Sequence, residues 1–317
     1  TLALAAELAH AVPAPQVGMG PALPLLDRDL SILAFNERVL SWAERKDVPL
    51  LERLRYLCIV SSNLDEWFEV RSAPHVAVAQ TGEERDSYTR TRFAALMDKA
   101  QALVAQQYQI YNQALIPAFH THGIRLISHG ERNAAQRRWV HEYFLREVQP
   151  LLVPVGLDPS HPFPQVANKA LNFIVRLDGV DAFGRANEVA IVKVPRALPR
   201  LIPMPQKIAG KQRLFVSISS IVRAHLAELF PGREVTEFSQ FRVTRNSDLA
   251  VDEEDVINLR MALRQGLHHR HYGQAVRLEV SASCSAVLAN VLLQQHGLQK
   301  KALFRVKGPV TLKRQMQ

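Results

Sequence analysis

The chain has 317 residues, 47% of them hydrophobic and 22% charged, which is typical of a soluble globular protein and excludes a collagen-like or wholly disordered one. No apolar run reaches the roughly 20 residues of a membrane-spanning helix. The two cysteines, Cys58 and Cys284, exclude a disulfide framework and a Cys-based zinc site, and they fit a reducing, cytoplasmic setting.

The net charge of +9 is unevenly distributed along the chain. Segments 189–227 and 256–317 contain seven and ten Lys/Arg residues and a single acid, Glu279, so they carry +16 and the remainder carries −7. This asymmetry favours a polyanionic partner such as nucleic acid, polyphosphate or nucleotide. A solvated basic face would produce the same count, so charge alone leaves both interpretations open.

The first part of the chain is predicted to be helical. Residues 1–26 are rich in Ala and Pro and poor in charge, and we interpret them as a flexible leader. Apolar residues then recur at helical spacing, which predicts a helical N-terminal domain over 27–130. Pro74 predicts a kink or break within it, and its last helix should end before Gly123.

The second part has a mixed pattern, and we expect a middle domain of helices and short strands over 131–317, making the fold α+β. A helix over 131–150 precedes a Pro-rich irregular stretch, and short β-type runs then alternate with helical runs. Strands are predicted within 170–179, 187–195, 241–251, 275–282 and 301–310, helices within 253–267 and 285–297, and a strand that becomes a helix within 214–230.

The common nucleotide-binding and hydrolase motifs are absent from the sequence. It contains no G-x-x-x-x-G-K-[ST], no G-x-G-x-x-G, no H-E-x-x-H and no G-x-S-x-G. Two local features remain, one in each part of the chain.

The first feature is SSNLDEWFEVR, residues 61–71. Asn63, followed three residues later by Glu66, resembles a capping box at the start of a helix. Such a place also suits a phosphate or nucleotide, because free N–H groups and the positive end of the helix dipole meet there. A purely structural cap and a ligand contact are both compatible with these residues.

The second feature is a dense cationic cluster within LRQGLHHRHYGQAVRLEV, residues 263–280. Arginine suits bidentate contact with phosphate groups, and a solvated surface is the alternative. Metal binding is disfavoured, because the spacing of the three histidines fits no common zinc pattern. The cluster comprises Arg264, His268, His269, Arg270, His271 and Arg277.

Several segments resemble the type-1 polyphosphate kinases, in the order of that family. They include VPLLERLRYLCIVSSNLDEWFEVR (48–71), GLDPSHPFPQVANKALN (156–172), FRVTRNSDL (241–249) and YGQAVRLEV (272–280). The resemblance implies a helical N-terminal domain followed by a middle domain of helices and short strands. It also implies reversible synthesis of polyphosphate from ATP with Mg²⁺, by a homo-oligomer that often has a membrane-associated fraction.

The resemblance also suggests which residues bind substrates. It implies that Asn63 contacts the nucleotide, ATP or ADP, and we take Asp65 and Arg71 as further candidates beside it. The basic second half would guide polyphosphate. The candidates for those polyphosphate contacts are Arg264, His269, Arg270 and Arg277.

The family's chemistry resides in two further C-terminal domains related to phospholipase D, where a histidine of an H-x-K motif is phosphorylated. None of the twelve histidines here is followed two residues later by Lys. We therefore expect the phosphorylated histidine and the Mg²⁺ site to lie outside these residues, and this chain to be inactive alone. The alternative is a non-catalytic polyanion-binding or dimerisation module. Sparse aromatic residues in the basic segments disfavour specific nucleic-acid binding.

Overall fold

The structure is a computed structural model that describes residues 26–158, 160–180, 184, 188–247 and 273–316. Residues 1–25 of the predicted leader and the predicted helix within 253–267 lie outside the described residues. So do three candidates for polyphosphate contacts, Arg264, His269 and Arg270.

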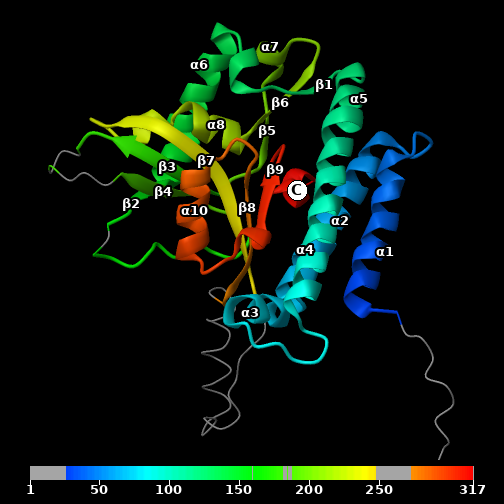
Figure 1. Ribbon diagram of the computed structural model, residues 1–317. Helices are drawn as coiled ribbons and strands as arrows, with labels where there is room; N and C mark the ends of the chain where they lie inside the picture. Colours follow the sequence, from blue (N-terminus) through cyan, green and yellow to red (C-terminus); the bar gives the residue numbers. More distant parts are fainter. Residues whose placement is uncertain (1–25, 159, 181–183, 185–187, 248–272, 317) are drawn as a thin grey trace, which may run out of the picture.

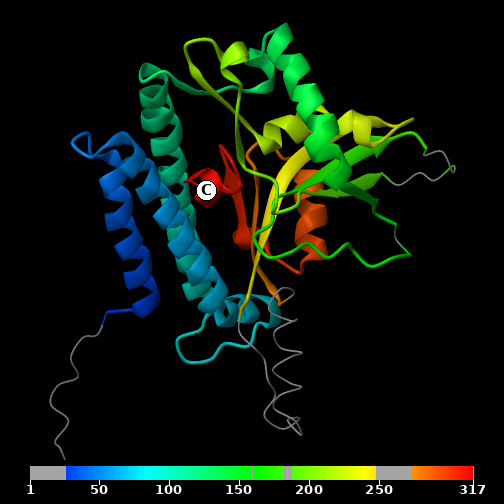
Figure 2. The ribbon, with the colours of Figure 1, turned by 180° about the vertical axis from the view of Figure 1, so that it is seen from behind.

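The first part of the chain forms a layer of antiparallel helices (Figures 1 and 2). Asp27 begins the first helix by accepting a hydrogen bond from the backbone N–H of Leu30 (2.9 Å), and Thr89 caps α4 in the same way. The main helices are α1 (Arg28–Glu44), α2 (Leu50–Val70), α3 (Ala73–Thr81), α4 (Arg90–Ile110) and α5 (Ile116–Thr121).

Two predicted boundaries in this layer are confirmed. The helix is interrupted between α2 and α3, and Pro74 lies in the first turn of α3, where the missing N–H of proline breaks no hydrogen bond. A π-helical turn, Tyr111–Leu115, joins α4 to α5, and α5 ends before Gly123, which has a φ of 71°.

The second part is built on a six-stranded sheet of order β2-β4-β3-β7-β8-β9, antiparallel except for the parallel pair β8–β9. β7 begins earlier than predicted, and the short strand β2 was missed in the Pro-rich stretch. The strands are β2 (Val153–Gly156), β3 (Asn172–Asp178), β4 (Val189–Lys193), β7 (Glu234–Arg245), β8 (Ala275–Ser281) and β9 (Leu303–Val306).

A smaller sheet ties the two parts of the chain together. Its order is β1-β6-β5, and β1, which directly follows the helical layer, pairs in parallel with β6. The strands are β1 (Ile124–Leu126), β5 (Leu201–Pro203) and β6 (Arg213–Ser217).

Helices and short turns complete the second part, which is therefore of mixed α and β structure as predicted. The α-helices are α6 (Ala134–Tyr143), α7 (Gln206–Ala209), α8 (Ile218–Ala224) and α10 (Ala286–Gln295). A π-turn covers Phe144–Val148, and 3₁₀ turns cover His129–Glu131, Gln149–Leu151, Leu226–Leu229 (η5), Lys300–Ala302 and Leu312–Met316 (η8).

The helical layer packs against the β8–β9 side of the large sheet, and α10 lies on the other side (Figures 1 and 2). Phe68 of α2 meets Phe304 of β9 edge to face, with ring centroids 5.5 Å apart. Gln107 of α4 donates to the backbone carbonyl of Leu57 in α2 (2.7 Å), which fixes the two helices together. Among the described residues, no helix combines the length and apolarity needed to cross a membrane.

Candidate functional site

Asn63 lies inside α2, not at its start. The helix runs from Leu50 to Val70 without interruption, because its apolar residues keep helical spacing through the motif. The predicted capping box is therefore wrong, because the N–H groups at the start of α2 lie around Leu50 and not at Asn63. The Asn63 amide instead donates to the side-chain oxygen of buried Asn36 in α1 (2.9 Å).

Arg71 points to a different place from Asn63. Its guanidinium pairs with the buried carboxylate of Asp29 (2.5 Å), which also contacts His75 (3.2 Å). Burial raises the pKa of Asp29, but the hydrogen bonds from Arg71 and His75 outweigh it and keep that pKa below its usual value. Since Asp65 points toward the sheet, the structure does not bring the three candidates Asn63, Asp65 and Arg71 together.

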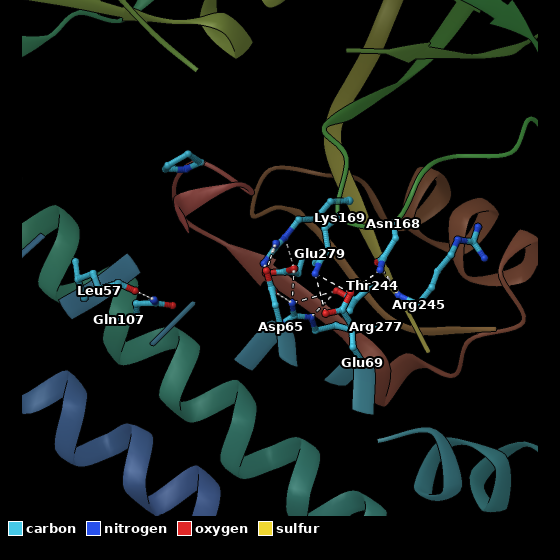
Figure 3. Close-up of polar contacts among 12 residues, drawn as sticks. Leu57, Asp65, Glu69, Gln107, Asn168, Lys169, Thr244, Arg245, Arg277 and Glu279 are labelled. Carbon is cyan, nitrogen blue, oxygen red and sulfur yellow. Dashed lines mark hydrogen bonds and ion pairs between the residues drawn. The ribbon is translucent and has the colours of Figure 1, made fainter. Parts of the chain in front are cut away.

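Asp65 lies at the centre of a buried ion-pair cluster between α2 and the large sheet (Figure 3). The other charged members are Arg242 on β7 and the residues Arg277 and Glu279 on β8. The strand register places Arg242 opposite Glu279 and Thr244 opposite Arg277. Since side chains two residues apart share one face of a strand, all four point toward α2.

The contacts in this cluster are short and mutually supporting. Arg242 donates to Asp65 (3.0 Å), and Arg277 donates to the hydroxyl of Thr244 (3.1 Å) and contacts Glu279 (3.2 Å). Arg277 also pairs with Asp65, and Arg242 pairs with Glu279. The Arg277 guanidinium lies 4.3 Å from the centre of the Phe68 ring. Two acids and two arginines therefore neutralise one another inside the protein.

The charges in the cluster determine the protonation of Asp65 and Arg242. Burial raises the pKa of Asp65, but the charges of Arg242 and Arg277 outweigh burial and hold that pKa below its usual value. For Arg242, burial lowers the pKa, and the charges of Asp65 and Glu279 raise it above its usual value. Asp65 and Arg242 are therefore both held in their charged forms at neutral pH.

Arg277 is 1% exposed. Both interpretations of Arg277 from the sequence, a polyphosphate contact and a solvated surface, require an exposed guanidinium. Its burial contradicts them, because α2 covers the face of β8 on which Arg277 lies. Its guanidinium contacts Asp65, Glu279 and Thr244, so Arg277 and Asp65 stabilise the packing of α2 on the large sheet.

A second layer of polar contacts continues along α2, one turn beyond Asp65 (Figure 3). Glu69 accepts from the side chains of Asn168 (2.5 Å) and Lys169 (2.7 Å). Asn168 also accepts from the backbone N–H of Arg245 (3.0 Å), which ties the loop before β3 to the end of β7. Lys169 has a φ of 56°, a costly conformation for a residue with a side chain, so this network holds Lys169 under strain.

Above the ion-pair cluster lies a small polar pocket of about 240 Å³, called the basic pocket below. Five of its lining residues are cationic, and the one acid is Asp65, which the buried arginines already neutralise. The pocket is lined by Asp65, Lys169, Arg196, Arg242, Thr311, Lys313 and Arg314.

Next to the basic pocket, Arg200 is buried without a partner. It is 6% exposed, and none of its three guanidinium nitrogens has a hydrogen-bond partner in the part of the chain that the structure describes. Burial, together with the charges of Arg314 and Arg196, lowers the pKa of Arg200 to about 10. An unpaired buried guanidinium is costly, so Arg196, Arg200 and Arg314 form a local excess of positive charge that an anion would relieve.

The basic pocket suits phosphate groups. Arginine and lysine donors around a small polar cavity match the charge and geometry of phosphate oxygens. Mg²⁺ does not fit, since the pocket offers it one carboxylate and that carboxylate is paired with two arginines. Arg196 in the pocket and Arg200 beside it were not singled out from the sequence, although both lie in the acid-free segment 189–227, which was a usable signal.

Comparison with known proteins identifies the family. A family model described as "Polyphosphate kinase N-terminal domain" matches residues 25–127, and one described as "Polyphosphate kinase middle domain" matches residues 135–317. Together they cover the helical layer and the sheet-containing part. The chain therefore belongs to the polyphosphate kinase family.

Individual relatives agree with this assignment. The chain is 49% identical over 294 residues to "Polyphosphate kinase" of Neisseria meningitidis serogroup B, and 47% identical over 305 residues to that of Burkholderia vietnamiensis. These matches cover 92% and 94% of the chain but 43% and 44% of the relatives, so the chain spans less than half the length of these curated relatives.

A solved structure shares the fold. "Crystal Structure of Polyphosphate Kinase from Porphyromonas Gingivalis" matches with a TM-score of 0.75 and 26% sequence identity. The match covers 93% of this chain and 41% of that one.

Proposed function

We propose that this chain is the nucleotide-positioning and polyphosphate-guiding part of a polyphosphate kinase. The intact enzyme would transfer the terminal phosphate of ATP reversibly to inorganic polyphosphate through a phosphohistidine intermediate. Phosphoryl transfer depends mainly on positioning and on charge stabilisation, and this chain would contribute both. Homo-oligomerisation, Mg²⁺ dependence and peripheral association with the inner membrane are part of the same proposal.

The observation that carries the proposal is the unbalanced positive charge at the basic pocket. Burial, together with the charges of Arg314 and Arg196, lowers the pKa of Arg200, and burial together with the charge of Arg196 lowers that of Arg314. Arg200 is buried with no hydrogen-bond partner among the described residues. An unpaired buried cation destabilises a folded protein, whereas a site for an anion needs positive charge that no acid already neutralises. A phosphate chain entering the pocket would supply the missing counter-charge.

Arg200→Gln tests this role in the chain as it stands. Binding of fluorescently labelled polyphosphate, followed by anisotropy, should weaken by about tenfold or more, because a charged hydrogen-bond donor is lost. Arg55→Gln on the exposed surface of α2 removes the same charge and is the matched control. Binding of both proteins should weaken as salt rises, but Arg55→Gln should bind almost as tightly as the wild type.

The stability of Arg200→Gln gives an independent measurement. Because the unpaired guanidinium is costly to bury, this variant should unfold at a higher temperature than the wild type when no polyanion is present. Equal, small losses of polyphosphate binding in Arg200→Gln and Arg55→Gln would contradict the assignment of the basic pocket and leave only a diffuse surface effect.

Asn63 is proposed to contact the nucleotide through its side-chain amide. In a full-length enzyme that carries this chain, Asn63→Ala should raise the KM for ATP. Asn36→Ala removes the same hydrogen bond between α1 and α2 but leaves the Asn63 amide in place. An equal change in KM in both variants would reduce Asn63 to a structural link between the helices.

The phosphoryl acceptor is proposed to lie outside these 317 residues, since none of their histidines begins an H-x-K motif. The purified chain, incubated with Mg²⁺ and γ-labelled ATP, should form no acid-stable long-chain polyphosphate. Product that persists after contaminating kinases are excluded would mean that an acceptor exists within this chain.

A further inference from the structure

His141, His225 and Glu228 meet where the end of α6 approaches the segment that follows α8; both helices are labelled in Figure 1. His141 lies in the last turn of α6, His225 directly precedes the 3₁₀ turn η5 after α8, and Glu228 lies within that turn. In a 3₁₀ turn, side chains three residues apart lie one above the other, so His225 and Glu228 point the same way. His141 and Glu228 are 87 residues apart in sequence, which is why no spacing rule reveals the set.

The three side chains converge on a small volume. One carboxylate oxygen of Glu228 is 2.7 Å from Nδ1 of His225, and the other is 3.3 Å from Nε2 of His141. One nitrogen of each imidazole and one oxygen of the carboxylate all lie within 4.8 Å of one another. Tetrahedral zinc, with bonds of about 2.0–2.2 Å, needs its ligand atoms about 3.3 Å apart. It also lies near the plane of each imidazole ring that binds it, so the exposed ring of His141 must turn out of its stack on His225 to complete the geometry.

The ring of His225 is held in place by its neighbours. It stacks on buried Phe144 with ring centroids 4.5 Å apart, and on His141 with centroids 5.1 Å apart. Its Nε2 is buried and has no hydrogen-bond partner among the described residues, so Nδ1 is the nitrogen that faces Glu228. His141 and Glu228 are 47% and 40% exposed, which leaves an approach from solvent.

We propose that His141, His225 and Glu228 form a binding site for Zn²⁺. Two neutral imidazoles and one carboxylate are a ligand set that zinc prefers, and the exposed side leaves a fourth position open to solvent. Bound zinc would join α6 to the α8–η5 segment, which are separated in sequence by the five strands β2 to β6.

The surroundings limit the affinity of the site. Burial and the charges of Arg132 and Arg223 lower the pKa of His129, which shows that positive side chains gather around His129. The charge of His225 also acts on His129, so these arginines lie near the proposed site. Arg132 donates to Ser220 (2.5 Å) and stays in place. These charges oppose a cation, so zinc binding is expected to be weaker than in a closed four-ligand site, and Glu228 becomes the essential neutralising ligand.

Zinc binding to the untagged chain can be measured by competition with a chromogenic chelator. The wild type should take up one more zinc ion than Glu228→Gln, and His141→Ala should bind at least about tenfold more weakly at this site. Co²⁺ in place of Zn²⁺ should give visible absorption bands of a four-coordinate site in the wild type and not in either variant. Zinc should also raise the thermal midpoint of the wild type more than that of Glu228→Gln.

Two controls separate this site from other histidines. His161→Ala removes an exposed histidine that pairs with the single carboxylate of Asp158, and it should bind zinc like the wild type. Replacing His268, His269 and His271 together by Asn should also leave the site intact. The proposal is overturned if that triple variant loses the zinc and the Co²⁺ bands while Glu228→Gln and His141→Ala keep them, or if all variants bind zinc equally.

Discussion

Replacing Asp65 by Asn should destabilise the protein strongly, because it breaks a buried cluster that is now neutral. Asp65 contacts both Arg242 and Arg277, and all three side chains are at most 4% exposed. Without the carboxylate, Glu279 alone must compensate two buried guanidinium groups. Removing one partner of a buried ion pair costs about 3–5 kcal/mol, and the Asn amide oxygen recovers part of one hydrogen bond, so the lower end of that range is expected.

Urea unfolding provides the assay, since buried Trp67 lies two residues after Asp65 and reports on its surroundings through fluorescence. With a denaturant dependence of about 3 kcal/mol per molar urea, the midpoint should fall by about 1 M. Far-UV circular dichroism must follow the same transition for this conversion to hold.

The matched control is Asp98→Asn, which removes the same charge from an exposed pair with Lys301 (2.5 Å). Surface ion pairs contribute less than about 1 kcal/mol, so the urea midpoint of Asp98→Asn should barely move.

The dependence of stability on acidic pH gives a second check. Because the folded-state pKa of Asp65 is lowered, its stabilisation is full above the unfolded pKa and is lost as pH falls through the folded pKa. Equal effects of the two substitutions at neutral pH would refute the reasoning.

Further predictions concern the packing of the second half. Burial lowers the pKa of His296 to about 4, so as pH falls this histidine is protonated in the unfolded protein before it is protonated in the folded one. The free energy of unfolding should therefore be full above pH 6.5 and fall by about 3 kcal/mol toward pH 4. His296→Gln should reduce that fall, measured by urea unfolding at several pH values. Gly308→Ala would place a methyl group 2.9 Å from the Tyr108 ring and should cost about 1–3 kcal/mol in thermal unfolding; an unchanged midpoint would mean that the ring moves freely. Tyr108→Phe removes the hydrogen bond from the Tyr108 hydroxyl to the Pro309 carbonyl (2.6 Å) and should lower the free energy of unfolding by about 1 kcal/mol in urea denaturation. An unchanged free energy would mean that water satisfies that carbonyl equally well.

The sequence predicted the elements better than their contacts. The helices of the first part, the break at Pro74 and the strand around Arg277 follow from local spacing and turn chemistry. The error at Asn63 arose because Asn followed by Glu three residues later also occurs in the middle of a long helix. The continuous apolar face from Leu54 to Phe68 was the stronger signal and favours an uninterrupted helix.

The position of Arg277 could not be read from its own strand. Alternating charged and apolar residues in a strand usually mean that the charged face meets water. Here that face is covered by α2, which is more than 200 residues away in sequence, and Asp65 supplies the counter-charge. The basic pocket was missed for a similar reason, because Lys169, Arg196 and Arg314 come from three segments that are far apart in sequence and meet only in the fold.

The long separation between Asp65 and its partners also affects how the protein is made. Arg242 follows Asp65 by 177 residues and Arg277 follows it by 212. At ordinary rates of translation, the partners emerge from the ribosome roughly 10–40 s after α2. During that interval the nascent helices expose an apolar face and a carboxylate that has no counter-charge. The helical layer is therefore synthesised before the sheet that neutralises it, and it reaches its final state only once that sheet has formed.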